Sequence, residues 1–150
     1  MRGQFDGNEV VLERALPFVL HACYQQLRSL TYREFLGHGL ELTPEQWVVL
    51  VRLWQKDGQT QSALSQSTLR DAPTMSRILD SMEKSGLVTR TVDSKDARTR
   101  IVALTREGKG LKKKLSPIAK TIVDRLESGI SEADLLTTRN TLRRLFENLA

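Results

Sequence analysis

The stretch from Asp71 to Thr105 constrains the fold of this chain more than any other. It starts with an acid followed by Pro73, an order typical of a helix start, because the acid caps free amides and proline is tolerated in the first turn. Apolar residues then recur at three- and four-residue spacing, which predicts one buried helical stripe of Met75, Ile78, Leu79 and Met82. Gly86 predicts the end of this helix, since glycine adopts positive φ without strain.

Two segments rich in β-branched residues follow, 87–92 and 100–104, and a polar, turn-forming segment separates them. This pattern predicts an antiparallel hairpin. Basic residues lie near its tip, and short hydroxyls and an arginine occupy the start of the preceding helix, a composition that suits phosphates and base edges. The layout is that of a winged helix. Taken alone, the stretch fits equally well a helix packed on an ordinary hairpin with a solvated, charged turn.

The residues before this stretch favour the winged helix. Thr43 and Gln46 have the spacing of a capping box, with Pro44 in the first helical turn, and so predict a helix start. A short helix over 60–66 and a turn over 67–70 then lead into the helix after Asp71. A short helix, a tight turn and a longer helix form a helix-turn-helix, whose second helix enters the major groove of DNA.

Amphipathic helices are predicted on both sides of this unit. In 9–36 one apolar stripe consists of Leu12, Leu16, Val19, Cys23, Leu27 and Leu30. Pro17 interrupts it, which predicts either a kink or a short lead helix followed by a second helix from near residue 17. In 106–150 we expect two helices, capped by Thr105 and Ser131, with Pro117 bending the first and Gly129 ending it. Such long helices need a partner surface, and a second copy of the chain is the most economical partner.

The predicted fold is therefore mainly α with a small β-hairpin wing. We expect a single domain of residues 1–150, in which a winged helix-turn-helix (43–105) is flanked by N- and C-terminal dimerisation helices (9–36 and 106–150). A chain of 150 residues is long enough to bury one core.

Composition excludes several classes of protein. No apolar run reaches the roughly 20 residues that span a bilayer, and the N-terminus lacks the apolar core of a signal peptide, so we expect a cytoplasmic protein without a membrane partner. Cys23 is the only cysteine, which excludes an intrachain disulfide, and two scattered histidines make no metal site. No phosphate-binding loop or nucleophile motif is present. We therefore expect no catalytic residues, no cofactor and no enzyme activity.

The positive charge is concentrated in one region. Residues 70–114 contain 12 Lys and Arg against 6 Asp and Glu, a local excess of +6 in a chain whose net charge is +5. The helix after Asp71, the hairpin and the segment beyond them therefore carry the whole excess. Such a concentration indicates a polyanionic partner rather than a merely solvated face.

In this order of elements the chain resembles the MarR family of bacterial transcriptional regulators, from about Leu12 to Leu149. The segments that carry the resemblance are LTPEQWVVL at 42–50, TMSRILDSMEKSGLV at 74–88 and DARTRIVALTREGKGL at 96–111. The resemblance implies an obligate homodimer on double-stranded DNA. Two-fold symmetry then implies a pseudo-palindromic operator whose half-sites lie about one helical turn, roughly 10 bp, apart.

The resemblance also implies the DNA contacts. It places the recognition helix in the major groove, with DNA-binding residues Thr74, Ser76, Arg77 and Lys84. It places Arg98 of the wing in the minor groove, where a narrow groove attracts a guanidinium, and gives Lys95 and Arg100 contacts to the DNA backbone. The preceding helix adds backbone contacts from Ser62 and Ser65. Asp96 is expected to orient Arg98, because phosphates repel a carboxylate.

Many members of this family are repressors released by small aromatic acids, often phenolic, that bind between the dimerisation helices and the winged helix. By this resemblance, the residues predicted to line such an effector pocket are Tyr24, Arg28, Trp47 and Trp54. For each of the four, a role in the core or in a salt bridge is the stronger interpretation.

Two alternatives stay open. Other relatives sense oxidants through a cysteine in the first helix, so Cys23 is a candidate redox residue. The resemblance aligns their cysteine near position 17, which is proline here, and Cys23 lies on the apolar stripe, where a buried thiol without a cationic neighbour tends to be inert. The second alternative is a winged helix that binds another protein instead of DNA, and the concentrated positive charge argues against it.

Overall fold

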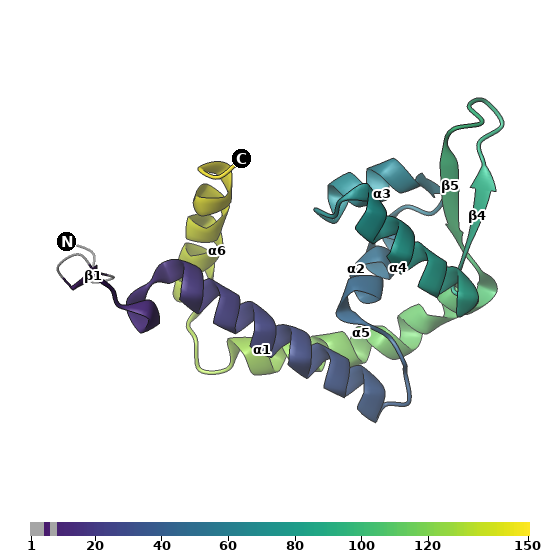
Figure 1. Cartoon of the computed structure of the whole chain (residues 1–150). Coiled ribbons are helices and arrows are strands. Elements are labelled where there is room, and N and C mark those ends of the chain that lie inside the picture. The colour runs from purple at the N-terminus through teal and green to yellow at the C-terminus, as the bar shows by residue number, and fades with distance from the viewer. Residues whose placement is uncertain (1–4, 7–8) are drawn as a thin grey trace.

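The computed structural model describes residues 5–6 and 9–150 (Figure 1). The N-terminal part consists of two paired two-residue strands, a short 3₁₀ helix and a long helix: β1 (Phe5–Asp6), β2 (Glu9–Val10), Leu12–Arg14 and α1 (Leu16–Gly37). The middle contains the elements of a winged helix: α2 (Pro44–Gln55), β3 (Gln59–Thr60), α3 (Gln61–Ser67), α4 (Ala72–Lys84), β4 (Val88–Val92) and β5 (Arg100–Leu104). Two further helices follow: α5 (Arg106–Glu127) and α6 (Glu132–Glu147). The predicted fold class, mainly helical with a small β wing, is confirmed.

Helices α2 to α6 begin where the sequence offers a side-chain cap, whereas α1 follows Ala15, which makes none. Thr43 accepts a hydrogen bond from the backbone amide of Gln46, whose side chain accepts one from the amide of Thr43, so the predicted capping box is present. Asp71, Thr105 and Ser131 cap α4, α5 and α6 in the same way, each bonding the amide three residues on. Each cap satisfies an amide that has no partner inside its helix, which is why these starts are predictable from sequence.

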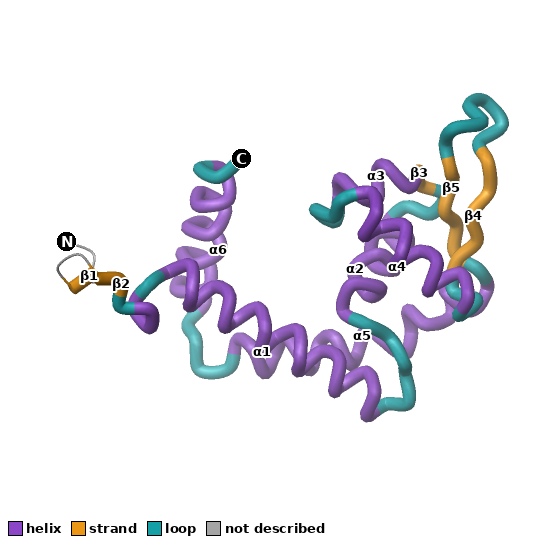
Figure 2. The backbone as a smooth tube through the Cα atoms, viewed as in Figure 1, coloured by secondary structure: helices purple, strands orange, loops and turns teal. Residues whose placement is uncertain are grey.

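The sheet has three strands instead of the predicted two. Its order is β3-β5-β4, and both pairings are antiparallel (Figure 2). Strand β3 pairs Gln59 with Val102 and Thr60 with Ile101. A strand of two residues shows no alternation of its own, and its partner lies about forty residues further along the chain, so local pattern does not predict it.

The N-terminal helix begins later than predicted. Residues 9–10 form β2, and α1 starts at Leu16 rather than at Glu9. Pro17 lies in the first turn of α1 and a short 3₁₀ helix precedes it, so the alternative with a lead helix is the correct one. A helix running from residue 9 through Pro17 would lose a backbone hydrogen bond and clash with the preceding turn.

One core joins the winged helix to the long helices. Its fully buried side chains include Phe35 of α1, Leu50 of α2, Leu64 of α3, Leu79 of α4 and Leu115 of α5. Pro117 lies inside α5, which continues through it as predicted. In Figure 1, α1 and α5 lie side by side along one edge of the molecule, with the winged helix at one end.

The other end of the molecule exposes apolar side chains. In α6, all of whose residues are described, none is buried, and the helix stands apart from the winged helix in Figure 1. The exposed apolar residues of α1, α5 and α6 include Leu16, Val19, Tyr24, Val123, Leu126, Leu136, Leu142 and Phe146. Large exposed apolar surfaces are rare in monomeric proteins and are typical of interaction sites. Among the helices formed by the described residues, none combines the length and the apolar character needed to cross a membrane.

Candidate nucleic-acid interface and adjoining crevice

The predicted recognition helix, α4, is held by its apolar side. Met75, Leu79 and Met82 are fully buried, and this leaves Arg77 exposed on the outer side. At the start of α4, the Asp71 carboxylate accepts hydrogen bonds from the amide (2.7 Å) and the hydroxyl (2.9 Å) of Thr74. These two hydrogen bonds hold the pKa of Asp71 below its ordinary value, and the bond from the amide has the larger effect. The Thr74 hydroxyl proton is thereby used inside the protein, so toward DNA this side chain offers its oxygen as an acceptor.

Two polar contacts fix the far half of α4. The side-chain amide of Gln46 donates to the Ser81 hydroxyl at 3.1 Å and so joins the start of α2 to α4. Arg90 of β4 forms ion pairs with Glu83 (2.8 Å) and with Asp80. The hydrogen bond from the Arg90 side chain is the main cause that lowers the pKa of Glu83. Both carboxylates are thus compensated on a helix that faces DNA in the predicted complex, where bare carboxylates would repel phosphate.

Two aspartates within the wing tip, Asp93 and Asp96, accept hydrogen bonds from its backbone. Asp96 accepts hydrogen bonds from the backbone amide of Arg98 at 2.9 Å and from the hydroxyl of Thr99 at 3.1 Å. Asp93 accepts one from the amide of Lys95 at 3.0 Å. Asp96 therefore holds the backbone of Arg98, whereas the expectation was that it orients the side chain. The side chains of Lys95, Arg98 and Arg100 are exposed.

A groove joins α3 to the wing. Four of the predicted DNA-binding residues line it: Ser62, Ser65, Arg98 and Arg100. Arg70 also lines it, from the turn between α3 and α4. Arg70 was missed in the sequence, although a basic residue directly before the cap of a recognition helix was a usable signal. Lys84 lies at the opposite end of α4 from Thr74 and Ser76, so its predicted contact involves a different part of the duplex.

A second hollow, the crevice, lies between α1, α2 and α5. It has a volume of about 350 Å³ and a largely apolar lining that includes Phe35, Val48, Ile122 and Val123. Three of the four predicted effector-pocket residues, Tyr24, Arg28 and Trp47, line it. This size and lining suit a small ligand with an apolar body.

Trp54, the fourth predicted effector-pocket residue, is not among the residues that line the crevice. Its indole N–H donates to the backbone carbonyl of Gly108 at 2.9 Å, and its ring packs edge-on against Trp47 at a centroid distance of 5.5 Å. Trp54 therefore joins α2 to the first turn of α5. The partner lies 54 residues further along the chain, so local sequence does not reveal the contact.

The charged groups of the crevice are one acid and two bases. Arg28 donates to Glu45 at 2.8 Å. Arg28 therefore has the salt bridge predicted from the sequence as the alternative to a ligand contact. Partial burial raises the pKa of Glu45, but the hydrogen bond from Arg28 and the charges of Arg28 and Arg70 outweigh it and hold that pKa low. Arg70 lines the crevice as well as the groove.

Cys23 is exposed on α1 in the single chain, so the expectation of a buried thiol is wrong for this chain alone. The stripe to which it belongs is largely uncovered here, with Leu16 and Val19 exposed as well. Within residues 5–6 and 9–150, no cluster of three or more His, Cys, Asp or Glu side chains has the geometry to hold a metal ion.

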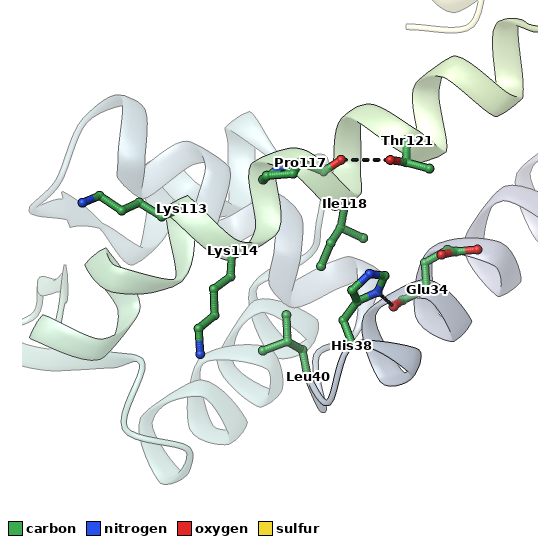
Figure 3. Close-up of a pocket in the computed structure, with 8 residues that line it drawn as sticks. All are labelled: Glu34, His38, Leu40, Lys113, Lys114, Pro117, Ile118 and Thr121. Carbon is green, nitrogen blue, oxygen red and sulfur yellow. Dashed lines mark hydrogen bonds between the residues drawn. The ribbon is translucent and has the colours of Figure 1, made fainter.

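Another hollow lies between the end of α1 and the middle of α5 (Figure 3). The His38 ring nitrogen Nδ1 lies 2.7 Å from the carbonyl oxygen of Glu34, and the Thr121 hydroxyl donates to the carbonyl of Pro117. The Glu34 carboxylate pairs with Arg125 of α5 at 3.8 Å. Lys113 and Lys114 leave α5 in different directions. No phenylalanine, tyrosine or tryptophan is among its lining residues, all of which lie in the described part of the chain, so it suits an aromatic ligand less well than the crevice does.

Comparisons with known proteins agree with this geometry. The model of the MarR family matches residues 42–99, which include the helix-turn-helix and the wing tip. The organic hydroperoxide resistance transcriptional regulator of Bacillus subtilis is 30% identical over 149 residues, covering 99% of this chain and 97% of the relative. The crystal structure of a probable transcriptional regulator from Pseudomonas aeruginosa has a TM-score of 0.80 and 30% identity, covering 89% of this chain and 98% of that one. The S. aureus MepR–DNA complex, 24% identical, has the same fold with a TM-score of 0.82, covering 89% of this chain and 98% of that one.

Proposed function

Since this chain belongs to the MarR family of DNA-binding transcriptional regulators, we propose that it is a homodimeric repressor that a small aromatic acid releases from its operator. The observation that carries the proposal is the groove. It brings two serines of α3 together with Arg98 and Arg100 of the wing, although these residues are far apart in the sequence. Hydroxyls and guanidiniums around one concave surface bind phosphates well.

The recognition helix supports sequence-specific binding. Arg77 lies exposed on the outer side of α4 and Ser76 is half-buried beside it, while the opposite side of the helix is anchored in the core. In this arrangement α4 enters the major groove, Arg98 enters the minor groove, and the serines of α3 hold the backbone. Thr74, Lys84, Lys95 and Arg100 complete the proposed contact set, and Asp96 holds the wing tip.

The exposed apolar surfaces of α1, α5 and α6 support the homodimer. A second copy would cover residues such as Leu142 and Phe146, which are exposed in the single chain. A dimer with two-fold symmetry presents two recognition helices to a pseudo-palindromic operator.

The crevice supports release by a ligand. Tyr24 and Trp47 offer aromatic surfaces, and Arg28 offers a charge for a carboxylate. The crevice lies between the proposed dimerisation helices and the winged helix, so a ligand there alters how the two recognition helices are spaced. A ligand that binds the form unfit for DNA lowers operator affinity.

The test is fluorescence anisotropy with a labelled operator duplex obtained by selection. We expect two chains per duplex, an affinity that falls steeply with salt, and release by aromatic carboxylates. The salt dependence follows from the counterions that lysine and arginine displace. Binding of one chain per duplex, or an affinity that does not change with salt, would contradict the proposal.

A redox switch is the second candidate. It is supported by the exposure of Cys23 on α1 and by the name of the relative from Bacillus subtilis. Mild peroxide followed by mass spectrometry, with operator binding of Cys23→Ser measured in parallel, separates the two switches. Release by peroxide that Cys23→Ser abolishes would support the redox switch, and release that persists in this variant would exclude it.

A further inference from the structure

Arg70 lies where the groove and the crevice meet. It lines the groove together with Ser62 and Arg98, and it also lines the crevice together with Arg28 and Glu45. It is half-buried and occupies the turn between α3 and α4. No other residue is shared by the linings of these two hollows, both of which are built from described residues.

The backbone at Arg70 is firmly held. Its amide donates to the carbonyl of Ser65 at 3.0 Å, and the next residue, Asp71, caps α4. The preceding residue, Leu69, has a φ of +56°, a conformation that non-glycine residues adopt at a cost and only when the surrounding structure enforces it. Because the backbone is fixed, a change of side-chain rotamer is what can move the guanidinium of Arg70 from one hollow to the other.

The charges of the two hollows suit different anions. The charged residues lining the groove are three arginines, at 70, 98 and 100, which suits DNA phosphate. Those lining the crevice are Arg28 and Arg70 against one acid, Glu45, inside an otherwise mainly apolar wall. The crevice therefore has one unmatched positive charge, and a ligand that satisfies it is an apolar or aromatic molecule with one carboxylate. A guanidinium binds carboxylate and phosphate with the same bidentate geometry.

We propose that Arg70 is the residue for which DNA and ligand compete: it contacts operator phosphate in the unliganded repressor, and an aromatic carboxylate in the crevice draws its guanidinium away. This inference rests on the proposed function, since it gives ligand release a residue and a ligand charge. Because the coupling of two binding sites is reciprocal, bound operator weakens the ligand by the same factor.

The experiment uses full-length protein, a selected operator duplex and two probes of similar shape. The probes are 4-hydroxybenzoate, an anion, and 4-hydroxybenzyl alcohol, which is neutral. Operator affinity is measured by anisotropy with and without each probe. Probe binding to the free protein is measured by tryptophan fluorescence, which reports on the crevice because Trp47 lines it. The test variant is Arg70→Gln. The first control is Arg98→Gln, which removes a groove arginine that does not line the crevice. The second control is Lys120→Gln, which removes an exposed charge on α5 that pairs with Asp124.

In wild type, saturating 4-hydroxybenzoate should raise the operator Kd by about 5- to 150-fold, the usual range of such coupling, and the alcohol should have little effect. Arg70→Gln should bind operator more weakly with a salt slope smaller by about one, and its release ratio should fall to about two or less. It should also bind 4-hydroxybenzoate more weakly as free protein. Arg98→Gln should lose operator affinity but keep the wild-type release ratio, and Lys120→Gln should match wild type.

The outcomes separate the two proposals. A wild-type release ratio that Arg70→Gln retains, or unchanged binding of 4-hydroxybenzoate to free Arg70→Gln, overturns the role of Arg70 and leaves ligand release intact. Equal release by the anion and the alcohol overturns the charge argument. If neither probe changes tryptophan fluorescence or operator affinity in wild type, release by an aromatic acid fails, and this inference fails with it.

Discussion

Arg98 at the wing tip has an exposed side chain on a backbone that Asp96 holds. Arg98→Ala removes a guanidinium from a pre-arranged position without leaving a buried group unpaired. We expect it to weaken operator binding by about 1–3 kcal/mol, with the fold unchanged. Anisotropy against the selected operator measures the loss, and circular dichroism checks the fold. The control is Lys120→Ala, and equal affinities of the two variants would show that the wing does not contact DNA.

At this scale, sequence predicts residues whose role depends on neighbours in the chain. Asp71 and Thr43 cap the helices that follow them, and each bonds a group three residues away. Prediction from sequence fails where the residue's partner is distant in the chain. Trp54 bonds Gly108, and Arg70 reaches the crevice only because α1 and α5 pack beside the helix-turn-helix.

The first turn of α5 fits closely against Leu87, the residue that precedes β4. A Cβ added at Gly108 would lie 2.2 Å from the backbone carbonyl oxygen of Leu87, and backbone cannot move aside as a flexible side chain can. Gly108→Ala should therefore destabilise the protein by about 1–3 kcal/mol or more. Gly110→Ala is the matched control, since its Cβ meets nothing within 4 Å, and it should stabilise the helix by about 1 kcal/mol. Urea unfolding measures the free energy of unfolding of both variants. Equal effects of the two substitutions would refute the close fit at Gly108.

The loop after α2 is joined to β5 and α5 through Asp57. Its carboxylate accepts hydrogen bonds from the backbone amides of Leu104 (2.8 Å) and Gly58 (2.9 Å), and it pairs with Lys109. Burial raises the pKa of Asp57, but these contacts outweigh it, so the folded-state pKa lies below the ordinary value of 3.8. Its contribution to stability is therefore present above pH 3.8 and is lost as pH falls through the lower, folded-state pKa.

We predict that Asp57→Asn lowers the free energy of unfolding at pH 7 and that the difference from wild type shrinks below pH 3.8. Urea unfolding of both proteins between pH 7 and pH 3 measures it, and the comparison cancels the titration of the other acids. A difference that stays constant over this range would contradict the role of the Asp57 charge.

At the scale of elements, caps, glycines and apolar periodicity predict α2 to α6 and the β4–β5 hairpin. They do not predict β3, whose two residues acquire strand geometry by pairing with β5. They also place the start of α1 too early, because the apolar periodicity extends through residues that form a strand and a 3₁₀ helix. Periodicity reports which residues are apolar, and Pro17 decides where the helix starts.

For the whole molecule, the exposed apolar residues of α6 support the proposed homodimer. Phe146 is 55% exposed on this helix. Phe146→Glu should dissociate the dimer and make operator binding depend on protein concentration, because a charge is expensive to bury in an apolar interface. Thr137→Glu is the control, since nine residues of helix place it on the opposite side of α6. Light scattering after size exclusion gives the mass. The Thr137→Glu variant should remain a dimer, and a dimer that survives Phe146→Glu would refute this interface.

In the proposed complex, two copies of this chain present their recognition helices to one face of DNA. Selection of binding sites from a pool of random duplexes, followed by sequencing, tests it most directly. We predict a motif with two-fold symmetry whose half-sites are centred roughly 10 bp apart, because the half-site spacing follows the geometry of the dimer. A motif without symmetry would contradict the paired recognition helices, and enrichment of no motif at all would contradict sequence-specific binding.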